Sequence, residues 1–159
     1  MIKYKIFNNF SLILLLVTIS CNSIPESNSI LSLPTVFSDQ MVLQQNKNVN
    51  FWGKAGPNEK VKVTGSWGES KSINANNKGE WELTILTTNA GGPFEVIVET
   101  SNKTINYKDV LIGEVWLSSG QSNMQWILNQ CKNCIDNQDE EIANANNNQI
   151  RMFSVPQDL

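Results

Sequence analysis

One serine stands out in the stretch GEVWLSSGQSNMQW, which runs from Gly113 to Trp126. The stretch opens with apolar residues and continues through Ser and Gly, which predicts a buried strand, a tight turn and then a helix. Such a turn would expose Ser122 at the carboxyl edge of a sheet, with the free N–H groups of the helix facing developing negative charge. Gly120 would let the backbone bend and a substrate approach closely. This arrangement suits a serine nucleophile.

A purely structural interpretation of the same residues is also open. Ser122 and Asn123 precede an apolar stripe, where such residues commonly cap a helix. GQSNM departs from the G-x-S-x-G elbow, because Met124 occupies the last place. The chain also contains no histidine, the usual base that activates a serine hydroxyl. Glu114 or a lysine could act as a base in principle, but Glu114 precedes Ser122 by about 8 residues, roughly 25 Å of extended chain.

Residues 30–108 read as short strands separated by turns. Period-two alternation marks half-buried strands in KVKVTGSW, WELTIL and FEVIVET. The expected inward residues of these runs are Val61 and Val63, then Trp81, Leu83 and Ile85, then Phe94, Val96 and Val98. The breaks AGPNEK, NNKGE and NAGGP supply Gly, Asn and Pro, which favour turns. With no helical stretch between the strands, this range is predicted to be a small antiparallel β-sandwich domain of about 80 residues.

Residues 109–159 show a different pattern. VLIGEVWL is an almost unbroken apolar run, which is typical of a strand covered on both faces in a parallel sheet. Met124, Ile127, Leu128, Cys131 and Ile135 form one stripe of an expected amphipathic helix, and IRMFSVP reads as a second strand. Strand, helix and strand open an α/β domain. About 50 residues are too few to complete one, so we expect this domain to be incomplete through truncation of the gene product.

Residues 1–20 are predicted to be a signal peptide. Lys3 and Lys5 precede the apolar run FSLILLLVTIS, which is too short to span a bilayer. VTISC resembles the lipobox of a bacterial lipoprotein, which would lipidate Cys21 and make residues 21–29 a polar tether. The expected location is therefore outside the cytoplasm, as a periplasmic or cell-surface lipoprotein of a bacterium. Its contact with the membrane would be limited to the lipid anchor.

Composition argues against two classes of partner. The net charge is −3 and the pI is about 4.9, so the chain lacks the clustered cations that neutralise phosphates, and nucleic-acid binding is not expected. Cys131 and Cys134 form a lone C-x-x-C motif. Without histidine or a second such motif, zinc is not expected, and an exported protein favours a local disulfide or two structural thiols.

LIGEVWLSSGQSNMQW is very similar to the nucleophile segment of the sialate O-acetylesterase family, which has the usual form G-[DE]-V-W-L-C-S-G-Q-S-N-M-x-W. This family belongs to the wider SGNH-type carbohydrate esterases, with a flavodoxin-like catalytic domain. The stretches LPTVFSDQMVLQQNKNVNFWGKAGPNEKVKV, GEWELTI, GGPFEVIV and IRMFSVP resemble further segments of its N-terminal part. The resemblance implies that Ser122 is the nucleophile and that its backbone N–H is an oxyanion donor. Gly120, Gln121 and Asn123 would line the site, while Ser118 stands where the family usually has Cys.

The reaction implied by the resemblance is removal of O-acetyl groups from sialic acid or other acetylated glycans through an acetyl-enzyme, without a metal or organic cofactor. In the family, the general-base His and its Asp partner come from a late segment that nothing in this chain matches. We therefore expect the chain to be inactive alone and to need a C-terminal remainder that supplies both residues.

Two alternatives stay open. The first is a surface glycan-binding β-sandwich module that stacks sugar rings on an exposed aromatic side chain. Among Trp52, Trp67 and Trp81, the sequence favours Trp67 as the exposed one, because it lies near a turn, whereas Trp81 shares a face with core residues. The second alternative is a non-functional truncated remnant.

Overall fold

The computed structural model of the chain describes residues 30–131 and 134–155. The predicted signal peptide, tether and lipidation site at Cys21 lie outside the described residues. Within the described ranges, no helix is long and apolar enough to cross a membrane.

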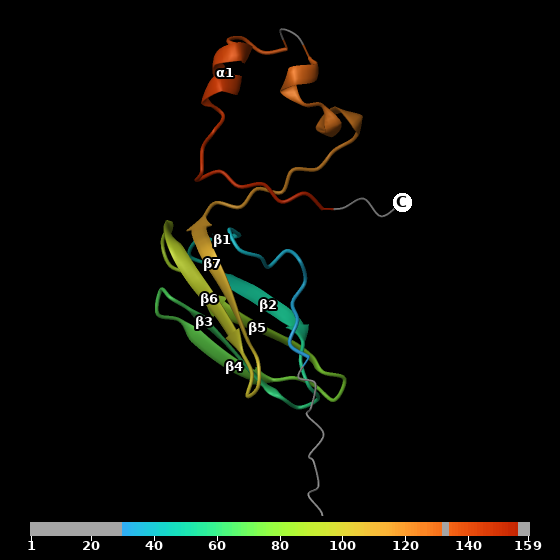
Figure 1. The fold of residues 1–159 in the computed structure, drawn as a ribbon, viewed down its shortest axis with the longest axis vertical. Helices are drawn as coiled ribbons and strands as arrows, with labels where there is room; N and C mark the ends of the chain where they lie inside the picture. The colour runs from blue at the N-terminus through green and yellow to red at the C-terminus, as the bar shows by residue number, and fades with distance from the viewer. Residues whose placement is uncertain (1–29, 132–133, 156–159) are drawn as a thin grey trace, which may run out of the picture.

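The structure is mostly β-sheet with few helices (Figure 1). The strands are β1 (Val42–Gln44), β2 (Asn48–Lys54), β3 (Lys60–Gly65), β4 (Ser70–Asn74), β5 (Glu80–Leu86), β6 (Gly91–Glu99) and β7 (Thr104–Gly113). They are followed by the short 3-10 helices η1 (Ser122–Gln125) and η2 (Leu128–Gln130) and by the helix α1 (Gln138–Asn144). Five strands form one sheet in the order β1-β7-β6-β3-β4, and β2 pairs with β5 in a second sheet.

The two sheets bury a common apolar core. Phe51 on β2 and Ile85 on β5 are fully buried, as are Val61 and Val63 on β3 and Val96, Val98 and Val110 on β6 and β7. The alternation predicted for the three runs of residues 60–98 is confirmed, since Trp81 and Leu83 are also buried and Phe94 packs against the core. Each run presents every second side chain to the core, as the pleat of a strand requires.

The strand predicted for VLIGEVWL is only partly correct. β7 crosses the expected domain boundary at residue 108 and ends at Gly113, and Val115, Trp116 and Leu117 are exposed. β7 pairs in parallel with β1, over Val42–Gln44 and Leu111–Gly113, and antiparallel with β6. In the described part of the chain, no strand is paired with the residues after Gly113, so no sheet covers their apolar side chains.

The helix expected from Met124 to Ile135 and the strand expected in IRMFSVP are not present either. Where the single helix was expected, the described residues form the short 3-10 helices η1 and η2. α1 begins later, at Gln138, and residues 150–155 have no regular secondary structure. Met124, Ile127, Ile150 and Met152 are exposed. An amphipathic stripe or an apolar run fixes an element only when a second surface covers it, and neither sheet does so. In Figure 1 the orange and red part of the chain, which contains α1, lies beyond the end of the sheets at which β7 ends.

Candidate functional site

The segment that carries Ser122 leaves the sheet at the end of β7, where residues of β1 and its following turn hold it. The backbone N–H of Gln45 donates to the carbonyl of Gly113 at 2.8 Å. The backbone N–H of Val115 donates to Oε1 of Gln44 at 2.9 Å. Residues about seventy positions apart in sequence therefore fix the direction in which the chain leaves β7.

Glu114 is bound by the same two glutamines, Gln44 and Gln45. Its carboxylate accepts hydrogen bonds from Nε2 of Gln45 at 2.7 Å and from Nε2 of Gln44 at 2.9 Å. The hydrogen bonds from Gln45 and Gln44, helped by the charge of Lys47, lower the pKa of Glu114 below its usual 4.5. A carboxylate that is stabilised in its ionised form is a weaker base. Glu114 is therefore a structural anchor and a poor substitute for the missing imidazole.

We predict that the stability contributed by Glu114 depends on pH. Because its pKa is lower in the folded chain than in the unfolded chain, this contribution is complete above pH 4.5 and is lost as the pH falls through the lowered value. Glu114→Gln should lower the thermal unfolding midpoint at pH 7, and the difference from the wild type should shrink toward pH 3. A difference that stays constant between these pH values would contradict an ionic role for this side chain.

Ser122 is exposed and begins η1, with Gly120 and Gln121 just before it. The turn is closed by a hydrogen bond from the backbone N–H of Met124 to the carbonyl of Gln121 at 2.9 Å. A Cβ on Gly120 would lie only 2.6 Å from Cγ of Met124, so this position requires glycine or a shift of the methionine. The structure thus places Ser122 in an exposed tight turn, but on an extension of the chain and not directly at the rim of a sheet.

Of the predicted site residues, Gly120, Gln121 and Ser122 are contiguous and exposed. The expected role of the Asn123 side chain lies outside what the structure describes. Among the hydrogen bonds of residues 30–131 and 134–155, none involves the Ser122 hydroxyl that a base would have to deprotonate. In the same ranges no group of three His, Cys, Asp or Glu side chains could hold a metal ion.

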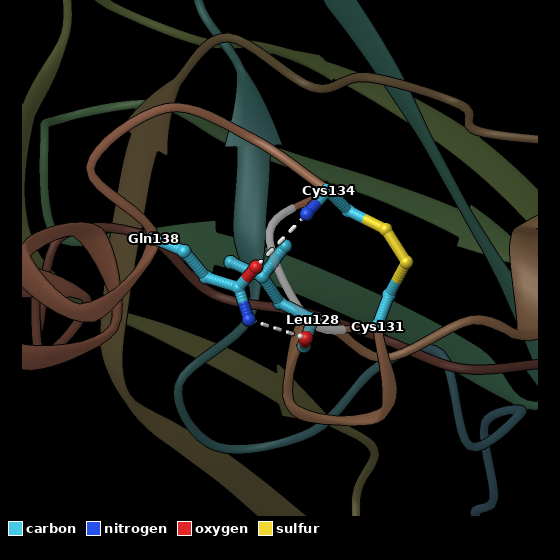
Figure 2. Close-up of a disulfide and its surroundings, with 4 residues drawn as sticks. All are labelled: Leu128, Cys131, Cys134 and Gln138. Atoms are coloured by element: carbon cyan, nitrogen blue, oxygen red, sulfur yellow. Dashed lines mark hydrogen bonds between the residues drawn. A yellow bond between two sulfur atoms is a disulfide. The ribbon is translucent and has the colours of Figure 1, made fainter.

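A disulfide follows the serine segment. Cys131 and Cys134 are paired as a disulfide, one of the two states expected from the sequence, and their Cα atoms lie 5.6 Å apart. Figure 2 shows how Gln138 supports this loop: its Nε2 donates to the carbonyl of Leu128 at 3.0 Å, and its Oε1 accepts from the backbone N–H of Cys134 at 3.1 Å. One side chain at the start of α1 therefore ties η2 to the bridge.

Arg151 attaches the last described segment to β7. Its Nη1 donates to the backbone carbonyl of Asp109, and its Nη2 lies 3.0 Å from Oδ1 of the same residue. Asp109 has a positive φ of 54° and lies where β6 and β7 shift register, so its carbonyl is available to a side chain. Sequence reasoning gave Arg151 no role, because the partner lies 42 positions away.

The prediction that Trp67 is the exposed tryptophan of the strand region is wrong. Trp67 is only partly exposed: its Nε1 donates to the carbonyl of Leu86 at 2.8 Å, and its ring packs edge-on against Phe94 with 5.7 Å between the ring centroids. Among Trp52, Trp67 and Trp81, Trp52 is the exposed one, at 43%. The alternation of NVNFWGK, which faces Phe51 inward and Trp52 outward, is the sequence signal that could have identified it.

Comparison with known proteins gives consistent results. No protein-family model matches the chain. Sialate O-acetylesterase of Mus musculus is 36% identical over 126 residues, which cover 72% of this chain and 23% of that protein. Sialate O-acetylesterase of Homo sapiens is 35% identical over 130 residues, covering 74% of this chain and 24% of that protein. This chain therefore spans about a quarter of the length of these two relatives.

A solved structure supports the same relationship. The crystal structure of a carbohydrate acetylesterase from Xanthomonas citri superposes with a TM-score of 0.72 at 33% identity, over 80% of this chain and 28% of that one. The resemblance to sialate O-acetylesterases predicted from the sequence is confirmed by these matches.

Proposed function

We propose that this chain supplies the serine nucleophile of a carbohydrate O-acetylesterase. The observation that carries the proposal is the similarity to acetylesterases at 33–36% identity over 72–80% of the chain. That similarity supports an acetylated carbohydrate as the substrate class. Sialic acid is the sugar named for the curated relatives, and other acetylated glycans are the alternative substrates.

The proposed chemistry is acyl transfer to Ser122. Its oxygen attacks the acetyl carbonyl, the carbon–oxygen bond to the sugar breaks, and the sugar hydroxyl leaves with a proton. Water then attacks the acetyl-enzyme, which releases acetate and restores the serine. The backbone N–H of Ser122 is the proposed oxyanion donor, with Gly120, Gln121 and Asn123 lining the site. The exposed position of Ser122 in a tight turn is compatible with this role.

The proposed mechanism needs an imidazole from outside these 159 residues, because they contain no histidine. Glu114 is held by Gln44 and Gln45 with a lowered pKa, which argues against it as the base. We infer that a further polypeptide segment supplies an Asp–His pair and that the 159 residues alone are inactive. The exposed apolar side chains of Trp116, Leu117 and Phe153 suit burial under such a segment.

The finer architecture belongs to the same proposal. The two sheets that share one core would form a β-sandwich domain, and the residues after β7 would open an SGNH-type α/β esterase domain. Export through the signal peptide of residues 1–20, and anchoring through a lipid on Cys21, would bring the enzyme to extracellular or periplasmic glycans.

The test measures acetate release from O-acetylated sialic acid and from acetylated xylan. We expect the 159-residue chain alone to release acetate at the rate of buffer. Mixing it with the polypeptide encoded downstream of Leu159, if that polypeptide carries an Asp-x-x-His segment, should restore release from at least one substrate. Intergenic sequence after Leu159, or a mixture that remains inactive on both substrates, would contradict the proposal.

A further inference from the structure

The outward face of the β2–β5 sheet combines one aromatic ring with several polar groups. Residues opposed across an antiparallel pair share a face, and Trp52 is opposed to Glu82, Lys54 to Glu80 and Asn50 to Thr84. The face therefore carries an indole ring with carboxylate, ammonium and amide groups on both sides of it.

An open groove of about 890 Å³ runs over this face. Leu33 and Pro34 contribute to its wall, and Asn50, Trp52, Glu80 and Glu82 line it from the two strands. Sites for small molecules commonly measure about 300–1,000 Å³ and combine apolar or aromatic surface with a few polar groups. The β2–β5 groove has both properties, and it is lined by none of the residues of the serine segment.

The ring of Trp52 packs against residues of the core. Its ring meets Phe37 edge-on, with 4.8 Å between the ring centroids, and Phe37 stacks on the buried Phe51 at 4.9 Å. An aromatic ring that is held in place while 43% exposed loses little freedom when a ligand covers it. The ring is therefore a pre-formed apolar platform.

The polar groups around the platform form hydrogen bonds with one another. Nδ2 of Asn50 donates to Oε1 of Glu82 at 3.1 Å. Glu80 accepts from Nζ of Lys54 and from Nδ2 of Asn76, each at 3.1 Å. These carboxylate oxygens can accept further hydrogen bonds, because each has more than one lone pair. Hydroxyl groups that surround a bound ring would find hydrogen-bond acceptors here.

We propose that the β2–β5 groove binds a neutral glycan, with one pyranose ring stacked on Trp52 and its hydroxyls bonded to Asn50 and Glu82. An indole face suits the apolar C–H face of a sugar ring, and its polar rim suits the hydroxyls. Lys54 and Glu80 balance each other, which leaves Glu82 as the uncompensated charge of the lining. A negative lining repels the carboxylate of sialic acid, so the preferred glycan is neutral.

The test titrates the 159-residue chain with cellotetraose, chitotetraose, maltotetraose and sialyllactose by calorimetry. We expect at least one neutral tetrasaccharide to bind more tightly than sialyllactose. Trp52→Ala should weaken that binding about tenfold or more, as for the central aromatic residue of an interface, and Trp52→Phe should restore part of it. Leu86→Ala is the matched control, since Leu86 is an exposed apolar residue of β5 outside the groove.

Glu82→Gln keeps an oxygen acceptor but removes the charge, so it should narrow the preference for neutral over sialylated sugar. It also tests the site if Trp52→Ala fails to fold. The proposal is overturned if none of the neutral tetrasaccharides binds at millimolar concentration, if folded Trp52→Ala binds as tightly as the wild type, or if Glu82→Gln leaves the preference unchanged. Binding should be the same in Ser122→Ala, so failure of the esterase proposal would leave this one standing.

Discussion

Ser122→Ala is expected to lower acetate release by about 10³-fold or more when this chain is assembled with the segment that supplies its Asp–His pair. The methyl group cannot form the acetyl-enzyme, so only positioning and the oxyanion donors would remain to accelerate hydrolysis. The effect should fall on kcat, because the hydroxyl acts on the reacting carbonyl and contributes little to binding of the sugar.

Ser119→Ala is the matched control for this substitution. Ser119 is an exposed serine of the same segment, three positions earlier, and the proposed mechanism gives it no role. The measurement is the initial rate of acetate release over a range of substrate concentrations, with circular dichroism to show that each variant is folded. Equal rates for Ser122→Ala and the wild type would eliminate Ser122 as the nucleophile, whereas equal losses in both variants would indicate a structural effect of the segment.

Phe51→Ala is expected to destabilise the chain by about 3–5 kcal/mol, the range observed when a buried phenylalanine is truncated. Phe51 is fully buried on β2 and stacks on Phe37, so its removal would leave a cavity between the two sheets. The loss would be large because the β2–β5 sheet has only two strands and depends on the core for its stability.

Urea unfolding followed by far-ultraviolet circular dichroism measures this loss. Ile73→Ala on β4 serves as the control, because Ile73 is 40% exposed and its truncation should change the free energy of unfolding by about 0.5 kcal/mol or less. If Phe51→Ala cost no more than Ile73→Ala, β2 would not be docked on the common core. The same variant should also impair the β2–β5 groove, since Phe51 supports Trp52 through Phe37.

The strands of residues 60–98 could be predicted because their signal is local. Val61 and Val63, or Leu83 and Ile85, lie two positions apart, and a pleated strand turns that spacing directly into one buried face. The exposed turn at Ser122 could be predicted for a similar reason, since Gly and Ser tolerate a tight turn wherever it occurs. The resemblance to acetylesterases also rests on residue order, and the comparisons confirm it.

The predictions that failed depended on what lies next to a segment. The apolar run from Val110 to Leu117 could be read as one buried strand, yet β1 accompanies it only as far as Gly113. In the same way, the indole N–H of Trp67 donates a hydrogen bond to the carbonyl of Leu86, whereas Trp52 is exposed and lines the β2–β5 groove.

The sequence by itself therefore determined the alternating faces, the positions of the turns and the motif that carries Ser122. Only the tertiary structure decided where β7 ends, that Gln44 and Gln45 hold Glu114 from 70 and 69 positions away, and that the indole of Trp67 bonds to the carbonyl of Leu86. The physical reason is that periodicity and turn preference arise within a few residues of chain. In contrast, the end of β7, the carboxylate of Glu114 and the indole of Trp67 each pair with residues far away in the sequence. Which residues these are depends on how the whole core packs.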